Sequence, residues 1–207
     1  MKIHPTAIVE ADVQIGSGTS IWDNVHVRHS TQIGDECIIG GKTYIAYGVK
    51  IGNRVKINSF VYICNAVTIE DGVMISAGTI FTNDRFPRAA TSDLKQLRTS
   101  DPDEHTLPTL IKEGVTIGAG CTIGNDLVIG RFAMVGMASL VTKSIPDFHL
   151  VMGHPAQSVG CVCRCGQPLM RFPADGSELD IPETSCSACG LKYQIKGREV
   201  IELTPPV

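Results

Sequence analysis

The chain has 207 residues, with 18 basic and 21 acidic side chains and a formal net charge of −3. This length allows one substantial domain and a small appendage, and the mixed charge gives no basis for non-specific binding to nucleic acid. No apolar run approaches the roughly 20 residues of a membrane-spanning helix. Patterned sequence starts at Ile3 and leaves no room for a signal peptide, so we expect a cytoplasmic protein.

The dominant pattern is an Ile or Val at every sixth residue. Helices and simple strands have apolar periods of about 3.6 and 2, so a period of six fits neither. It fits a short strand and a tight turn, repeated three times per coil of a parallel β-solenoid, better than an ordinary Val/Ile-rich sheet. The positions are Ile3, Val9, Ile15, Ile21, Val27, Ile33, Ile39, Ile45, Ile51, Ile57, Ile63, Ile69, Ile75, Ile111, Ile117, Ile123, Ile129, Val135 and Val141.

We call these Ile and Val positions rungs, and the residues between them fit the same prediction. Four places after a rung, a small or β-branched residue such as Ala7 or Val13 suits a second inward position, and one place after it Gly recurs, as at Gly16 and Gly34, where a turn needs little steric restriction. The repeat resembles that of the hexapeptide-repeat acyltransferases. This resemblance implies an all-β fold, a left-handed parallel β-helix, and the number of rungs predicts about six coils.

The segment that follows Ile21 contains the first departures from the repeat. Trp22, the only tryptophan, occupies a position that Gly usually fills and either lines a ligand cleft between subunits or covers a corner. His26 is a candidate substrate contact, and the alternative is a polar surface histidine. The spacing of His26 and His29 does not match the histidine zinc site of the carbonic anhydrase that shares this fold.

Residues 82–110 interrupt the ladder, which then resumes in the same phase. They must therefore form a long loop that protrudes from one corner, and loops of this length are typically functional or disordered. Their centre, residues 90–104, is polar in the manner of a disordered segment. We expect the polar residues of the preceding coils to have a structural role in turns, namely Asn58, Asn65, Glu70 and Asp71.

The start and end of this loop narrow the resemblance. The sequence Phe-Thr-Asn-Asp-x-x-Pro-Arg-Ala at 81–89, Pro-Thr-Leu-Ile-Lys at 108–112 and Gly-Ala-Gly at 118–120 resemble the branch that N-acetylates nucleotide-linked 3-amino sugars with acetyl-CoA. That branch acts on UDP- and dTDP-linked sugars and implies a homotrimeric enzyme of surface polysaccharide, including lipopolysaccharide, biosynthesis. The resemblance covers about residues 1–160 and leaves the identity of the nucleotide and of the sugar open.

The resemblance also implies roles for individual residues. Asn83 would hold the acceptor amine while the departing sulfur takes the proton, Asp84 would accept a hydrogen bond from the amine or a sugar hydroxyl, and Arg88 would bind a carboxylate or phosphate. Loop-initiating turn chemistry is the alternative explanation for Asn83 and Asp84. The acetyl-CoA groove is expected along the later coils, at Gly118, Ala119, Gly136 and Lys143.

Two other functions are compatible with the repeat. The chain could be an acyltransferase for another small acceptor, but hydroxyl acceptors generally need a base such as His, and His105 lies far from the motif in the sequence. It could also be a non-catalytic trimeric scaffold, which the intact pair Asn83 and Asp84 disfavours.

The last part of the sequence predicts a separate module. We divide the chain into an acyltransferase domain, residues 1–159, and a zinc-ribbon-like module, residues 160–207. Two pairs of cysteines, each followed by Gly, predict a closed, structural zinc site, with Cys161 as a spare or a competitor of Cys163. A disulfide is less compatible with the expected cytoplasmic location. The preferred ligands are Cys163, Cys165, Cys186 and Cys189.

Overall fold

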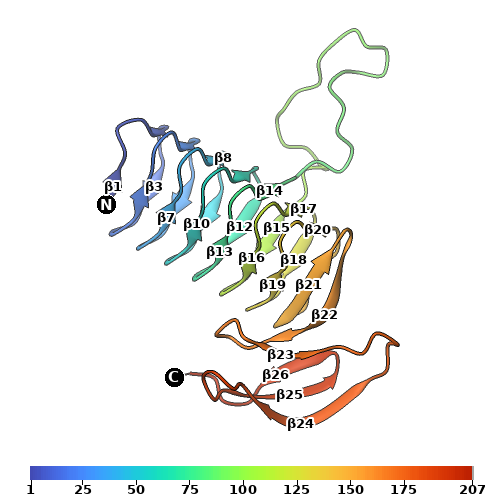
Figure 1. The fold of residues 1–207 in the computed structure, drawn as a ribbon. Coiled ribbons are helices and arrows are strands. Elements are labelled where there is room, and N and C mark those ends of the chain that lie inside the picture. Colours follow the sequence, from blue (N-terminus) through green and yellow to red (C-terminus); the bar gives the residue numbers. More distant parts are fainter. Residues whose placement is uncertain (207) are drawn as a thin grey trace.

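The computed structural model describes residues 1–206 and confirms an all-β architecture. Three parallel sheets form a prism of stacked coils that rises from the N-terminus, a long loop projects from one side, and a small C-terminal module lies against the far end (Figure 1). Within the described residues, no helix is long and apolar enough to cross a membrane.

The first sheet of the prism runs along its full length. It contains eight strands in parallel register, so the solenoid has about eight turns rather than the predicted six. The prediction was too low because the Ile/Val series leaves out three buried coil positions. Phe81 is aromatic, and Ile145 and Val151 fall outside the six-residue spacing; they complete the seventh turn and begin the eighth. The strands are β1 (Lys2–Ile3), β4 (Ser20–Ile21), β7 (Ile38–Ile39), β10 (Lys56–Ile57), β13 (Met74–Ile75), β16 (Thr116–Ile117), β19 (Met134–Val135) and β21 (His149–Gly153).

The other two sheets complete each coil. The second contains β2 (Ile8–Val9), β5 (His26–Val27), β8 (Tyr44–Ile45), β11 (Tyr62–Ile63), β14 (Ile80–Phe81), β17 (Thr122–Ile123) and β20 (Leu140–Val141). The third contains β3 (Gln14–Ile15), β6 (Gln32–Ile33), β9 (Lys50–Ile51), β12 (Val67–Ile69), β15 (Thr109–Ile111) and β18 (Leu127–Ile129).

The interior of the prism confirms the predicted inward positions. Ile39, Ile57 and Ile75 pair in register across adjacent coils and are fully buried, and burial of each such side chain contributes about 2–3 kcal/mol. The second inward position also holds buried threonines, whose hydroxyls need partners. Thr19 donates to the Gly34 carbonyl at 2.8 Å, so its burial leaves no unpaired group.

The structure shows why glycine is needed directly after a rung: the turns of adjacent coils stack closely there. A Cβ on Gly40 would lie 2.6 Å from the carbonyl carbon of Asn58 in the next coil, so Gly permits the close approach of stacked turns. The left-handed backbone conformation lies two residues later, as at Gly18 (φ 70°) and Asn24 (φ 52°). Close stacking, rather than an unusual dihedral angle, therefore requires glycine after a rung.

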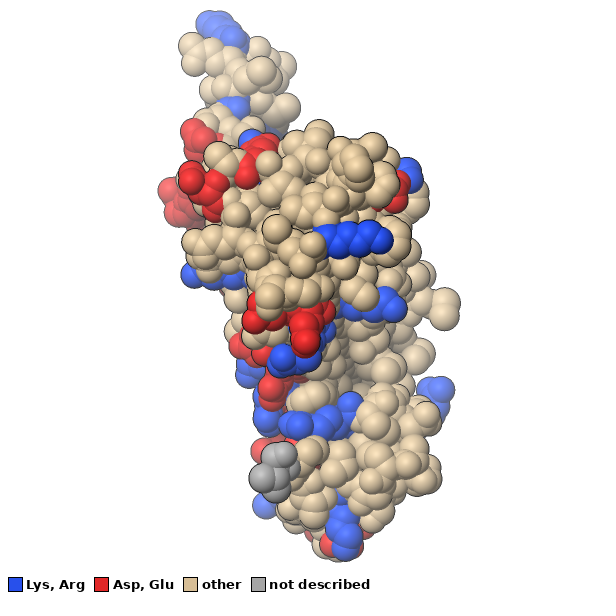
Figure 2. Space-filling model, turned by 90° about the vertical axis from the view of Figure 1, so that its left-hand side faces the viewer, with Lys and Arg blue, Asp and Glu red and all other residues tan. Residues whose placement is uncertain are grey.

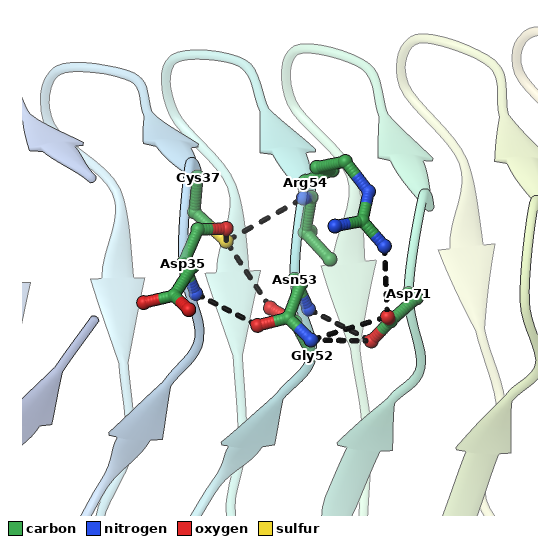
Figure 3. Close-up of polar contacts among 7 residues, drawn as sticks. Asp35, Cys37, Gly52, Asn53, Arg54 and Asp71 are labelled. Atoms are coloured by element: carbon green, nitrogen blue, oxygen red, sulfur yellow. Dashed lines mark hydrogen bonds and ion pairs between the residues drawn. The ribbon is translucent and has the colours of Figure 1, made fainter. Parts of the chain in front are cut away.

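A ladder of polar side chains stabilises the corner between the third and first sheets (Figure 3). Oδ1 of Asn53 accepts a hydrogen bond from the N–H of Asp35 at 2.9 Å, and Oδ1 of Asp71 accepts one from the N–H of Asn53 at 2.8 Å. Arg54 lies 3.2 Å from the other oxygen of Asp71. The N–H of Asn53 is the main reason that the pKa of Asp71 lies below its usual value. Each turn thus satisfies the backbone of its neighbour, and Asp71 has the predicted structural role.

The C-terminal module continues from β21 through antiparallel strands. β22 (Ala156–Val162) pairs with β21 and β23 (Pro168–Arg171), and a separate sheet contains β24 (Leu179–Ser185), β25 (Lys192–Gly197) and β26 (Glu199–Glu202). The module has its own buried cluster, which includes Cys161, Phe172 and Tyr193. The predicted boundary after residue 159 falls inside β22, and the division into two domains stays a prediction.

Candidate functional site

One corner of the prism carries a column of polar side chains. It joins the second sheet to the third, and the residues two places after each strand of the second sheet lie there. β8, β11 and β14 pair in parallel, with partners 18 residues apart, so the side chains that follow them stack along the prism axis. Tyr47, Asn65 and Asn83 occupy successive positions in this column.

Hydrogen bonds connect the members of the column. Nδ2 of Asn83 donates to Oδ1 of Asn65, and Nδ2 of Asn65 donates to the phenolic oxygen of Tyr47 at 2.7 Å. The ring of Tyr47 stacks on His29, with centroids 5.2 Å apart and 5° between the planes. Asn65 is only 8% exposed, so this arrangement is held inside the corner. Sequence reasoning assigned Asn65 only to turn structure and did not single out Tyr47.

A cavity of about 540 Å³ lies between this column and the inserted loop. The loop leaves after β14 and returns at β15, and antiparallel bridges from Asp84 to Thr106 and from Ala90 to Leu97 fold it back on itself. The loop centre, whose composition is like that of a disordered segment, thus pairs with itself at Ala90 and Leu97. The residues that line the cavity include Asn65, Asn83, Asp84, Arg88, Arg98 and Asp103.

The charged residues of the cavity have different surroundings. Oδ1 of Asp84 accepts a hydrogen bond from the N–H of Phe86 at 2.8 Å, so Asp84 has the turn role that was its alternative explanation. Arg88 donates to a neighbouring carbonyl and, within residues 1–206, pairs with no acidic side chain. Arg98, which sequence reasoning missed, lies on the returning arm 3.4 Å from Asp103. The cavity lining thus combines two guanidinium groups with the carboxylates of Asp84, Asp101 and Asp103. Arg98 is paired with Asp103, so Arg88 is the guanidinium group that is available to an anionic ligand.

Trp22 lies at a different corner. It follows β4, where the first sheet joins the second, and borders a separate groove of about 400 Å³. Its indole is about half exposed, and Nζ of Lys2 lies 5.3 Å from the ring centroid. Within one chain, the structure does not bring Trp22 together with Asn83.

His26 is part of a polar cluster on the outer face of the second sheet. Its Nε2 lies 2.8 Å from Oε1 of Glu10, and Nε of Arg28 lies 2.7 Å from the same oxygen. Hydrogen bonding from Arg28, helped by His26, lowers the pKa of Glu10 to about 2. The ring of His26 meets Tyr44 edge-on. His26 does not line the cavity at the loop, and its contacts fit the alternative of a surface histidine.

The predicted acetyl-CoA residues divide between two corners. Gly118 and Gly136 follow β16 and β19 and, with Ala119, continue the corner of Trp22 into later coils. Ala119 is exposed there. This corner and the corner of Asn83 are at opposite ends of the strands of the second sheet. A ligand held by both would therefore need two copies of the chain or would have to span the width of the sheet.

Lys143 belongs to the same column as Asn83. Phe81 pairs with Ile123 and Ile123 with Val141, so the residues two places after each lie on one line. At a strand spacing of about 4.8 Å, Lys143 is about 10 Å from Asn83 along the prism axis. It is exposed, and its ammonium group is accessible to a phosphate.

Four cysteines of the C-terminal module meet in space. The Sγ atoms of Cys163, Cys165, Cys186 and Cys189 all lie within 4.8 Å of one another, with 3.4 Å between Cys163 and Cys189 and 3.6 Å between Cys165 and Cys186. A tetrahedral zinc ion with Zn–S bonds of about 2.3 Å would separate its sulfurs by about 3.8 Å. The donor set therefore fits a metal ion of this kind.

The remaining features of the module distinguish ligands from packing residues. Backbone N–H groups of Ala188 and Cys189 lower the pKa of Cys186 to about 6, which favours the thiolate that binds metals. Cys161 is outside the cluster and fully buried, and burial raises its pKa to about 11. Of the two roles considered for Cys161, the structure supports that of a spare residue that packs in the core.

The charged side chains of one face of the molecule are mixed in sign. Figure 2 shows basic and acidic side chains interspersed over one face of the molecule, without a large patch of a single sign. On this face, the charged side chains therefore form no extended basic surface of the kind that binds nucleic acid non-specifically.

Comparison with known proteins agrees with the repeat. Residues 12–47 and 48–83 match the family described as bacterial transferase hexapeptide (six repeats). Residues 12–83 of the prism therefore match the hexapeptide repeat of this family. Residues 109–131, directly after the loop, match the hexapeptide repeat of succinyl-transferase. The hexapeptide-repeat matches thus flank the loop that contributes the cavity.

Three relatives illustrate the similarity. Over 86 residues the chain is 41% identical to dTDP-3-amino-3,6-dideoxy-alpha-D-galactopyranose 3-N-acetyltransferase of Aneurinibacillus thermoaerophilus. The aligned part is 42% of this chain and 40% of the relative. The chain thus spans two fifths of the length of that curated relative. A variant of AntD, an N-acyltransferase from Bacillus cereus in complex with dTDP and coenzyme A, has a TM-score of 0.48 and 23% identity, over 78% of this chain and 81% of AntD. PerB from Caulobacter crescentus, in complex with CoA and GDP-perosamine, has a TM-score of 0.41 and 21% identity, over 76% of this chain and 56% of PerB.

Proposed function

We propose that this chain transfers the acetyl group of acetyl-CoA to the amino group of a nucleotide-linked amino sugar. The observation that carries the proposal is the cavity that Asn83, Arg88 and Arg98 line together. A carboxamide oxygen accepts an N–H from an amine, and guanidinium groups suit the oxygens of a diphosphate. The identity with the dTDP-amino-sugar acetyltransferase supports the same substrate class.

The residues suffice for a base-free reaction. A neutral amine attacks the thioester carbonyl, the C–N bond forms, the C–S bond breaks, and the departing thiolate takes the proton that the amine loses. Asn83 would orient the amine through an N–H, with the lone pair toward the thioester. Among the described residues that line the cavity there is no histidine, and His105 packs edge-on against Phe86 in the loop.

We also propose that the active unit is a homotrimer. On the outer face of the second sheet, the adjacent strands β11 and β14 expose Tyr62 at 46% and Ile80 at 47%, and exposed apolar surface of this kind is typical of interfaces. Contact through this face would bring the Gly118 corner of one chain toward the Lys143 corner of its neighbour. Acetyl-CoA would then lie in the groove between them.

The cysteine cluster is proposed to hold one structural Zn²⁺. Four thiolates leave no open position for a substrate. Cys163 and Cys165 precede β23, whereas Cys186 and Cys189 follow β24, so an ion would join two distant segments of the module. Zinc would supply stability to the module and no step of acetyl transfer.

Screening of substrates tests the proposed reaction directly. The full-length protein is incubated with acetyl-CoA and UDP- or dTDP-linked 3-amino sugars, and products are analysed by mass spectrometry. A mass gain of one acetyl group on the nucleotide sugar, together with release of free thiol, is expected. Acetylation only of a hydroxyl or of an amine without a nucleotide would favour the other acyltransferase function, and no transfer to any acceptor would favour a scaffold.

A further inference from the structure

We propose that the groove beside Trp22 binds the nucleotide half of the amino-sugar substrate, with the nucleobase stacked on the indole of Trp22. This inference rests on the proposed function and deepens it, because it assigns a place to the nucleotide. The groove has a volume of about 400 Å³, and its lining extends from Trp22 to Ala77. It is separate from the cavity that Asn83 lines.

The indole of Trp22 forms one end of this groove. Trp22 follows β4, and the next two coils place Gly40 and Asn58 at the equivalent position, because β4, β7 and β10 pair in parallel with partners 18 residues apart. Nζ of Lys2, from the preceding coil, lies 5.3 Å from the centroid of the indole ring. The groove adjoins the indole on the side of Gly40, where no side chain covers it.

The lining of the groove suits a nucleoside. The indole is about half exposed, and an exposed aromatic ring beside a groove is a typical platform for a nucleobase, because every base has a π-face. Asn58 and Ser59 also line the groove, and their amide and hydroxyl groups can form hydrogen bonds with a base or a ribose. A purely apolar ligand would leave these polar groups without partners.

The charges around the groove suit a diphosphate. Asp23 lines the groove, but its Oδ2 is bound to Nζ of Lys42 at 3.0 Å, so these two charges compensate each other. Lys56 pairs in register with Ile38, which lines the groove. Within residues 1–206, neither Lys56 nor Lys2 forms an ion pair with an acidic side chain. The surroundings of the groove therefore carry an excess positive charge, which attracts phosphate oxygens.

The groove leads to the level of the proposed reaction. It crosses three coil steps from Trp22 to Ala77, because β4, β7, β10 and β13 are consecutive neighbours in the first sheet (Figure 1). At about 4.8 Å per step, this is about 14 Å, a length comparable to that of an extended nucleoside diphosphate. β13 and β14 belong to one coil, so Ala77 is level with Asn83.

The two corners would meet between chains of the proposed trimer. Ala77 and Asn83 are at opposite ends of a strand of the second sheet, so an amine carried to Ala77 would contact Asn83 of the partner subunit. Arg88 lines the same cavity as Asn83 and would reach the diphosphate from that subunit. The nucleotide would thus bind to one chain while its sugar reacts beside the next.

Acetyl-CoA also contains a nucleotide, but the order of the coils assigns this groove to the acceptor. The residues expected to bind acetyl-CoA, Gly118, Gly136 and Lys143, are in coils beyond that of Asn83, whereas the groove lies in the coils before it. Two substrates whose reacting groups meet at one level of a narrow cleft extend to opposite sides of that level. The base on Trp22 therefore belongs to the sugar nucleotide.

Trp22 reports directly on binding, because it is the only tryptophan of the chain. Titration of the full-length protein with dTDP, UDP and GDP should quench its fluorescence to saturation with at least one of them, whereas coenzyme A should leave it unchanged. Phe60→Ala, which removes an exposed ring that does not line the groove, is the matched control and should keep the quenching. Absence of quenching by all three nucleoside diphosphates, or quenching by coenzyme A alone, would overturn the inference.

Kinetics distinguish a binding role of Trp22 from a merely structural one. Trp22→Ala should raise KM for the amino-sugar nucleotide about 10- to 100-fold, the loss expected for one stacked base, while kcat and KM for acetyl-CoA stay within about threefold. Trp22→Phe keeps an aromatic face and should raise the same KM less than about fivefold. Equal losses in the two variants, or a change only in KM for acetyl-CoA, would contradict stacking of the acceptor base.

The outcomes separate this inference from the proposed function. A protein that is quenched by a nucleoside diphosphate but acetylates no nucleotide-linked amino sugar would overturn the proposed function and leave the nucleotide site. An active protein without quenching, whose Trp22→Ala variant is folded and kinetically unchanged, would overturn only the nucleotide site. Thermal melting and light scattering of each variant show whether the prism and its assembly are intact.

Discussion

The phenolic oxygen of Tyr193 lies 3.1 Å from Sγ of Cys163 in the buried core of the C-terminal module. The same oxygen accepts a hydrogen bond from the N–H of Arg164 at 3.0 Å, so the phenolic proton is free to point at the sulfur. A hydrogen bond from a fully buried tyrosine would stabilise a metal-bound thiolate and hold Cys163 in place.

Tyr193→Phe should therefore weaken zinc binding while the fold is retained. Loss of a hydrogen bond to a ligand typically lowers metal affinity about 10- to 100-fold. Competition with a chromophoric chelator measures the change, and Tyr62→Phe, which removes an exposed phenol from the prism, is the matched control. An affinity that is the same in both variants would show that Tyr193 only fills space.

Reduced, freshly purified protein should contain one zinc per chain. Replacement of Cys186 and Cys189 together by Ser should abolish this zinc and make residues 163–202 sensitive to proteolysis, because two of four ligands are lost. The prism should keep its melting transition, since its buried cluster is separate from that of the module. Protein without zinc, or global unfolding of the double variant, would contradict the prediction.

Asn83→Ala should lower kcat by about one to three orders of magnitude, because positioning of the reacting amine is lost. Binding of acetyl-CoA and assembly should be unchanged, as measured by calorimetry and light scattering. His105→Gln is the control and should change kcat less than threefold, because the thiolate takes the proton. Loss of activity in His105→Gln with the fold intact would instead identify a base and refute the base-free reaction.

The free energy of unfolding should fall as the pH decreases below about 6.5, and His149 should be the group responsible. His149 is buried between the prism and the module, with Nδ1 2.8 Å from Ser158 and Nε2 2.8 Å from the carbonyl of Arg198, and burial lowers its pKa. An unfolded histidine has a pKa of about 6.5, so below this value the unfolded state binds a proton that the native state excludes. The stability that neutral, buried His149 contributes is therefore complete above pH 6.5 and is lost on acidification.

Urea unfolding at pH 7.5 and pH 6.0, in saturating zinc, measures this effect. His149→Gln should be less stable at pH 7.5 and should show a weaker pH dependence than the wild type. The comparison removes the pH dependence that metal binding causes in both proteins. An identical slope in the two proteins would exclude His149 as the titrating group.

Light scattering should show a homotrimer at micromolar concentration. Tyr62→Arg combined with Ile80→Arg places two like charges on the apolar face of the second sheet and should yield monomers. Lys56→Glu, an exposed change on the first sheet, should leave the trimer intact. A wild-type monomer would remove the proposed acetyl-CoA groove, and a stable trimer of the double variant would exclude this face.

The repeat explains why most of the fold was predictable. Each Ile or Val rung is buried for the same reason in every coil, so its period in the sequence reports the architecture directly. The number of coils was underestimated because Phe81 is aromatic and because Ile145 and Val151 fall outside the six-residue spacing. The sequence also grouped the four cysteines whose sulfur atoms meet in the module, because their pairs and the following glycines are local features.

The candidate site at the Asn83 corner was harder to predict, because its contacts join residues of different coils that are far apart in the sequence. Asn65 resembles any turn asparagine when the sequence is read along the chain, and only its offset of 18 residues from Asn83 reveals that the two stack. Arg98 was missed for another reason. The repeat does not specify the path of the inserted loop, so nothing in the periodicity indicated that Arg98 returns beside Arg88.

The inserted loop leaves the register of the prism unchanged. Ile80 and Thr122 pair although they are 42 residues apart, whereas Tyr44 and Tyr62 pair at the usual 18. A loop of another length or composition can therefore replace this one without altering a single strand pair. Under the proposed function, the loop would contact the acceptor and the coils would bind the donor, so the two could be exchanged independently. A transplanted loop would then offer evolution, and the protein engineer, a way to change the sugar while the scaffold is kept intact.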